Sequence, residues 1–237
     1  MIISHRHKFI FIKTIKTAGT SIEVFLSQYC GPEDILTPIT PPVASHSPRN
    51  YGGFFNLVTE LTASHMREPG YPSRLGVMRR FLTQRKYFNH MPAVSVRALL
   101  PQHIWDGYFK FSVERNPLEK ALSFYNMQLY RNLVADKDDF FRQNRLPSDW
   151  ERYGAPHSGP IMDRILRYEN LNDELGEVFQ DLGIPYSGSL ETRAKGNYRA
   201  KRETYQMTFN DRQRAILEKR YAKECAHFGY SWDNGEL

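Results

Sequence analysis

The residues best suited to bind an anion lie near the start of the chain, in the segment FIFIKTIKTAGTS at positions 9–21. Its first five residues are mostly apolar and predict a strand, and the small residues that follow predict a turn and the start of a helix. The first turn of a helix presents backbone N–H groups without helical partners, and the helix dipole is positive there. Lys16 adds a cation, and the hydroxyl groups of Thr17, Thr20 and Ser21 add hydrogen-bond donors. The segment is therefore equipped to hold a phosphate or a sulfuryl group.

The spacing of these residues differs from that of the Walker phosphate loop, in which a lysine directly follows the second of two glycines. Here Lys16 precedes the one glycine of the segment, Gly19, by three positions. The wording KTAGTS instead resembles the phosphosulfate-binding loop of sulfotransferases that use 3'-phosphoadenosine 5'-phosphosulfate (PAPS), and within them the carbohydrate sulfotransferases. The resemblance implies nucleotide binding by Lys16, Thr17, Ala18, Gly19, Thr20 and Ser21. The alternative is an ordinary strand, turn and capped helix with a solvated lysine.

A second strand-to-helix junction lies in the segment YFKFSVERNPLEKALSFY at positions 108–125. Alternating apolar residues predict a strand. Asn116 is suited to cap the helix that follows, and Pro117 is suited to its first position. Arg115 then lies where the strand gives way to the helix, and Ser123 lies about two turns into the helix.

This junction resembles the element of the same sulfotransferases that binds the 3'-phosphate of the nucleotide. The resemblance implies that Arg115 and Ser123 bind that phosphate, and a guanidinium and a hydroxyl are suitable donors for it. Taken alone, Arg115 could instead form a surface ion pair with Glu119. Two such junctions in the same order are more specific than either one.

Weaker features agree with the same family. A histidine, His90, precedes the second junction at a place where related sequences carry one, and ILRYENL at 165–171 and FGY at 228–230 resemble later family segments. We expect His90 to be the general base, because imidazole titrates near neutral pH; His65 and Glu114 are the alternatives. The resemblance leaves residues 31–88 uncovered.

Two further groups of basic residues are candidates for the nucleotide site. Lys13 could approach the phosphosulfate or could equally lie outside the site at the end of its strand. In related enzymes a late basic loop closes over the nucleotide, and the segment RAKGNYRAKR at 193–202 takes that place here. Its candidates are Lys195, Arg199, Lys201 and Arg202, and the alternative is a solvated basic loop.

These motifs require a fold that places strand ends beside helix starts. Alternating strands and helices predict an α/β fold with a central parallel sheet flanked by helices, similar to the P-loop-NTPase-like fold of sulfotransferases. We expect one domain over residues 1–237, with an acceptor-side insertion at about 31–88. The predicted helices span Thr20 to about Tyr29, Pro117 to about Leu133, Asn172–Leu182, and Asn210 to about Phe228.

The composition limits the classes of function that this protein can have. The 237 residues carry a formal net charge of +6, which suits anionic ligands such as a nucleotide or an acidic glycan. The two cysteines, Cys30 and Cys225, lie far apart and predict free thiols, and neither they nor the histidines form a metal-binding pattern. The basic residues do not gather in one motif or aromatic platform, which argues against a nucleic-acid protein.

The sequence thus predicts an enzyme that transfers a sulfuryl group from PAPS to a hydroxyl, less readily an amine, of an acceptor that we expect to be a glycan. The mechanism needs no metal. A nucleotide kinase or NTPase is the alternative, and a sulfotransferase fold without activity is a third. No segment has the length of a membrane span, and we expect either a cytoplasmic, bacterial enzyme or a truncated enzyme of the Golgi type.

Overall fold

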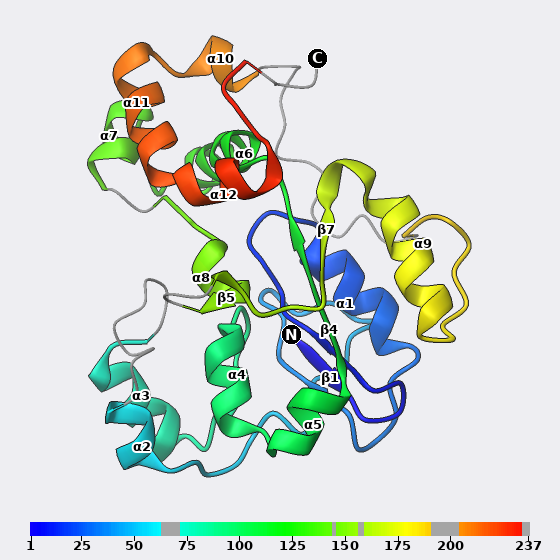
Figure 1. Cartoon of the computed structure of the whole chain (residues 1–237). Coiled ribbons are helices and arrows are strands. Elements are labelled where there is room, and N and C mark those ends of the chain that lie inside the picture. Colours follow the sequence, from blue (N-terminus) through cyan, green and yellow to red (C-terminus); the bar gives the residue numbers. More distant parts are fainter. Residues whose placement is uncertain (63–71, 144–145, 156–158, 191–203, 234–237) are drawn as a thin grey trace.

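Five strands form one mixed sheet, and helices pack against both of its faces (Figure 1). The structure is a computed structural model, and it describes residues 1–62, 72–143, 146–155, 159–190 and 204–233. The strand order is β3-β1-β2-β4-β7, with bounds Ile35–Leu36, Ile2–Ser4, Phe9–Phe11, Phe109–Glu114 and Arg164–Arg167. A separate antiparallel pair joins β5 (Gly154–Ala155) to β6 (Gly159–Pro160).

One strand of the main sheet, β1, runs opposite to the other four. β2, β4 and β7 run parallel, with Phe11 opposite Phe111 and Val113 opposite Leu166. β1 runs antiparallel to both β2 and β3. The short connection 5–8 links β1 to β2, and such a connection joins antiparallel strands, whereas parallel strands need a crossover of about a dozen residues or more. The α/β class is confirmed, and the predicted central parallel sheet is present in β2, β4 and β7, whereas the reversed strand β1 makes the whole sheet mixed.

One face of the sheet is covered by α1 (Gly19–Ser27) and α9 (Leu171–Asp181). Alternate strand residues meet apolar residues of both helices, and the buried members include Ile2, Phe9, Phe11, Phe111, Val113, Ile22, Leu26, Leu175, Val178 and Phe179. Because successive strand residues point to opposite faces, this cluster takes every second residue of β1 and β2.

The remaining strand residues point to the other face, which α4 (Ala93–Leu99) and α5 (Gln102–Gly107) cover. This cluster contains Met1, Ile3, Ile10, Ile12, Met91, Ala93, Val96 and Trp105. Burial on both faces explains why β1 and β2 are nearly continuous runs of apolar residues.

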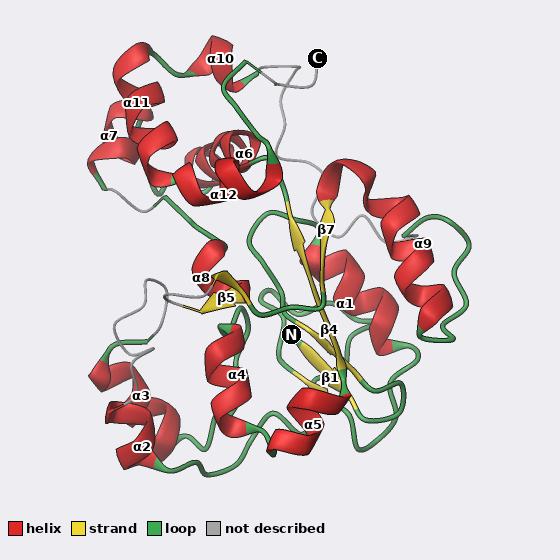
Figure 2. Cartoon of the chain, viewed as in Figure 1, coloured by secondary structure: helices red, strands yellow, loops and turns green. Residues whose placement is uncertain are grey.

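A third cluster lies beyond the end of β4, at the top of Figure 2, and is built from helices and the loops between them. It is built from α6 (Pro117–Tyr130), α7 (Lys137–Arg142), α10 (Tyr205–Thr208), α11 (Asp211–Arg220) and α12 (Ala222–Phe228). Its fully buried side chains include Tyr205 and Tyr221. The other helical elements are α2 (Leu57–Thr62), α3 (Arg74–Leu82), α8 (Trp150–Tyr153) and the 3-10 turn Tyr168–Asn170.

Three of the four predicted helices occur, as α1, α6 and α9, with ends within about three residues of the prediction. Asn116 caps α6 by accepting hydrogen bonds from Leu118 N and Glu119 N. The prediction of one helix from Asn210 to Phe228 is wrong, because the chain turns at the buried Tyr221 and continues as α12. No helix in the described part of the chain has the length and apolar character needed to cross a membrane.

A cluster of charged residues is buried where the sheet meets the third cluster. The Nζ atom of Lys120 lies 2.5 Å from Glu114 Oε1 and 2.9 Å from Asp149 Oδ2, and all three side chains are fully buried. Tyr153 donates its hydroxyl proton to Glu114 Oε2 over 2.7 Å. Burial raises the pKa of Glu114 to about 7. Burial would lower the pKa of Lys120, but the Asp149 and Glu114 carboxylates outweigh it and raise that pKa.

We expect Lys120→Met to lower the free energy of unfolding by about 3–5 kcal/mol, because it leaves two buried carboxylates without their shared cation. Urea denaturation of the purified protein measures this change. The control, Lys223→Met, alters an exposed lysine of α12 and should change stability by no more than about 0.5 kcal/mol. Equal losses in the two variants would contradict the role given to the cluster.

Candidate functional site

One cavity of about 640 Å³ brings together residues that are far apart in the sequence. It lies where β2 and β4 end and α1 and α6 begin. Its lining residues are Lys13, Thr14, Ile15, Lys16, Thr17, Ala18, Gly19, Thr20, Ser21, Thr40, Asn89, His90, Arg115, Ser123, Phe124, Met127, Arg131 and Tyr168. The predicted residues 16–21, His90, Arg115 and Ser123 therefore share one cavity, while the roles assigned to them stay predictions.

Hydrogen bonds to two other segments of the chain fix the turn between β2 and α1. Thr14 Oγ1 donates to Val113 O over 2.5 Å and lies 2.7 Å from Thr17 Oγ1. The backbone N–H of Ile15 donates to the Asp149 carboxylate, at 3.0 Å from Oδ1. These contacts fix the position of the backbone on either side of Lys16.

The backbone of the turn takes unusual conformations. Lys16 has φ 62° and Ala18 has φ 57°, both in the left-handed region that residues other than glycine seldom adopt. Ala18 is also the residue that precedes the first turn of α1. Such strain is found where a functional geometry is imposed by its surroundings.

Lys13 lies inside the site and not on the outer surface. Its side chain is buried, and Nζ forms an ion pair with Glu23 Oε2 at 2.5 Å. The aliphatic stem packs against Gly19, where a Cβ atom would lie 2.7 Å from Lys13 Cγ. Gly19 is therefore required by the close approach of the Lys13 stem.

Arg115 extends from the end of β4 into the cavity. Its guanidinium lies 3.3 Å from Glu119 Oε2 and 4.6 Å from the centre of the Tyr168 ring. The ion pair between Arg115 and Glu119 that the sequence suggested as an alternative therefore exists. Arg115 also lines the cavity. Ser123 follows two turns later on α6, and Met127 and Arg131 continue the same face at intervals of four residues.

His90 lines the cavity from another segment of the chain, the residues just before α4. Its Nδ1 atom lies 3.2 Å from the carbonyl oxygen of Lys13. Because a carbonyl only accepts, Nδ1 carries the hydrogen and Nε2 is left with the lone pair that can take a proton. Burial lowers the pKa of His90 well below its usual range, and the positive charges of Lys13 and Arg152 add to this effect. The imidazole is therefore neutral at neutral pH, but the lowered pKa also makes His90 a weaker base than the imidazole titrating near neutral pH that the sequence led us to expect.

Glu114, one alternative for the base, does not line the cavity. Its carboxylate accepts hydrogen bonds from Lys120, Tyr153 and the backbone N–H of Arg115, so it is a structural group. His65, the other alternative, and the late basic residues Lys195, Arg199, Lys201 and Arg202 lie outside the described residues. In the described part of the chain, no group of histidine, cysteine or carboxylate side chains could hold a metal ion.

Sequence reasoning missed several lining residues and one supporting group. The sequence could have predicted Met127 and Arg131 as lining residues, because they follow Ser123 at helical spacing on a predicted helix. Tyr168 lies in the segment ILRYENL, but no local signal indicated that it reaches Arg115. Asp149, which holds the turn at Ile15, lies in a polar stretch without periodicity and carried no signal.

We expect His90→Asn to reduce the loss of stability at acid pH. Below a pH of about 6.5 the unfolded chain protonates this histidine, whereas the folded protein keeps it neutral, so its contribution to stability falls as the pH drops. Asparagine tolerates the positive φ of 60° at this position. Urea denaturation at about pH 7.5 and pH 5.5 measures the effect, with exposed His103→Asn as control. An unchanged dependence on pH in His90→Asn would contradict a depressed pKa.

Comparisons with known proteins add little to these observations. No protein-family model matches the chain. The chain resembles the crystal structure of a sulfotransferase from Alicyclobacillus acidocaldarius with 17% identity and a TM-score of 0.35, over 94% of this chain and 96% of that one. An uncharacterized protein of Archaeoglobus fulgidus is 30% identical over 117 residues, which are 46% of this chain and 98% of the archaeal protein. The chain therefore belongs to the same family as this archaeal protein.

Proposed function

We propose that the protein transfers a sulfuryl group from PAPS to a hydroxyl group of an acceptor. The observation that carries this proposal is the shared cavity, in which the turn 13–21 faces Arg115 and Ser123, with His90 on the same lining. Two anion-binding elements in one cavity suit a nucleotide with phosphates at both ends, and the cavity has the size of small-molecule sites.

The charges around the cavity support an anionic ligand. The described residues that line it include the cations Lys13, Lys16, Arg115 and Arg131 and no carboxylate. Glu23 forms an ion pair with Lys13 and Glu119 forms one with Arg115, so these two cations are partly balanced within the protein. A donor with several negative charges fits this lining without a metal ion to balance it.

The residues of the site would act at both ends of the transfer. When bound, the donor supplies a sulfuryl group, whose bond to the bridging phosphate oxygen breaks as the acceptor oxygen bonds to sulfur. His90 Nε2 would take the proton of the acceptor hydroxyl. Lys16 and the first backbone N–H groups of α1 would stabilise the negative charge that develops on the phosphate side. Arg115 and Ser123 would hold the 3'-phosphate and so fix the donor.

We propose a carbohydrate as the acceptor, because the turn resembles that of carbohydrate sulfotransferases. Asn89, the residue before His90, lines the cavity and offers an amide suited to sugar hydroxyl groups. A screen of desulfated and natural polysaccharides with radiolabelled PAPS tests this choice separately from nucleotide binding.

We expect adenosine 3',5'-bisphosphate to bind without magnesium and more tightly than AMP, because only the bisphosphate can use Arg115 and Ser123. Arg115→Ala should weaken the bisphosphate about ten- to hundredfold and leave AMP nearly unchanged. Calorimetric titration measures both, and exposed Arg97→Ala is the control. Preference for ATP with magnesium would instead place the protein among the kinases.

We expect Lys16→Ala to lower kcat by about a hundred- to a thousandfold, since it removes a donor from the developing charge. His90→Asn should also lower kcat while the affinity for adenosine 3',5'-bisphosphate stays the same. Sulfate transfer to an active acceptor measures the rates, and circular dichroism verifies the fold. Turnover near the wild-type rate in Lys16→Ala would refute its catalytic assignment.

A further inference from the structure

Exposed apolar side chains gather in one part of the molecule that the nucleotide site does not use. Phe54, Val58, Leu75, Met78 and Leu82 are all exposed, with Leu75 80% and Leu82 74% accessible. They belong to α2, α3 and the residue stretch before α2. These helices stand at one end of the molecule, with α4 between them and the sheet (Figure 1). Apolar patches of this kind mark interaction sites.

The exposed residues of α3 form a stripe with a defined direction. Leu75, Met78 and Leu82 are separated by three and four positions, so they share one face of the helix. Val77 and Arg80 are buried on the opposite side. On the helical wheel, Arg74 lies at one edge of the apolar stripe and Arg79 at the other, and both arginines are exposed.

Contacts at the buried side fix which face of α3 points outward. The Arg80 guanidinium stacks 5.0 Å from the centre of the Phe55 ring and 4.5 Å from that of Phe88. It also pairs with Glu60 Oε1 of α2 at 3.2 Å. Because Arg80 is anchored in this way, the stripe of leucines cannot turn inward without breaking a buried ion pair.

The charge of the surrounding surface is positive. In the described residues 54–62 and 72–86, the acidic residue Glu60 is buried and paired, while Arg74, Arg79 and Arg85 are exposed. The surface therefore combines apolar side chains with cations. A second copy of the chain is a poor occupant, because a two-fold contact of this face with itself would oppose arginine to arginine.

We propose that this face of α3 docks on an anionic lipid surface. The leucines and Met78 would enter the boundary between headgroups and acyl chains, and the flanking arginines would lie at the level of the phosphates. Lipid phosphates supply the complementary charge and the hydrocarbon supplies the apolar phase. This docking does not depend on the nucleotide site.

The test is cosedimentation of the full chain with vesicles of phosphatidylcholine, alone or mixed with phosphatidylglycerol. We expect binding to the mixed vesicles that weakens as salt is raised. Leu75→Ser with Leu82→Ser should weaken it roughly tenfold or more, since two large apolar side chains no longer enter the lipid. Arg74→Gln with Arg79→Gln should remove most of the preference for the anionic vesicles.

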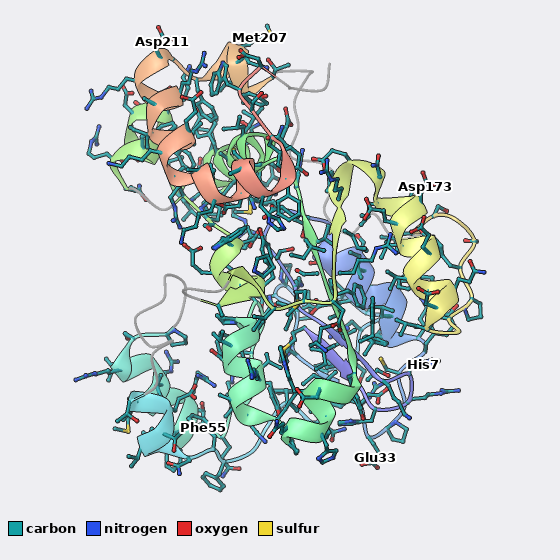
Figure 3. The ribbon with its side chains drawn as sticks, viewed as in Figure 1. His7, Glu33, Phe55, Asp173, Met207 and Asp211 are labelled. Carbon is teal, nitrogen blue, oxygen red and sulfur yellow. The ribbon has the colours of Figure 1, made fainter. Side chains whose placement is uncertain are left out.

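A matched control uses exposed apolar residues at the other end of the molecule. Met207 is 77% exposed on α10, and Figure 3 shows it far from Phe55. Met207→Ser with Ile216→Ser should leave vesicle binding unchanged. Circular dichroism and titration with adenosine 3',5'-bisphosphate verify that each variant is folded.

Three results would overturn the proposal. The first is no binding to either vesicle, and the second is binding that survives the paired leucine change. The third is self-association of the wild-type chain in analytical ultracentrifugation that the leucine change abolishes, which would assign the face to a second copy.

Discussion

The buried ion cluster is the interaction on which the candidate site depends. Lys120 joins two carboxylates from different parts of the chain, and each carboxylate also accepts a backbone N–H group of the site. Asp149 accepts from Ile15 in the turn after β2, and Glu114 accepts from Arg115 at the junction after β4. Buried charges are tolerated only when their partners and hydrogen bonds are complete. The need to satisfy these buried charges therefore positions the turn after β2 relative to the junction after β4.

Local signals were enough to predict much of the fold. Asn116 and Pro117 define the start of α6, and Asn210 with Gln213 forms the capping box that opens α11. Such signals act within a few residues, so a single sequence carries them. The turn after β2 and the junction after β4 were found in this way. Their convergence on one cavity followed from the order of strand and helix in each, because parallel strands end at the same edge.

Long-range contacts could not be read from the sequence in the same way. The three residues of β1 were too few for a periodic pattern, and its antiparallel pairing depends on the short link to β2. The break at Tyr221 carries no glycine or proline and results from burial of its ring in the third cluster. Asp149 reaches Ile15 across 134 positions, and only the folded chain shows that contact.

The close approach of Lys13 and Gly19 has an evolutionary consequence. The space that a side chain at position 19 would need is filled by the stem of Lys13, which Glu23 holds in place. A larger residue at position 19 therefore becomes acceptable only after position 13 has lost its long side chain, and Glu23 then keeps the N-terminal ammonium of Met1 as its buried cationic partner. In relatives of this protein positions 13 and 19 should therefore covary.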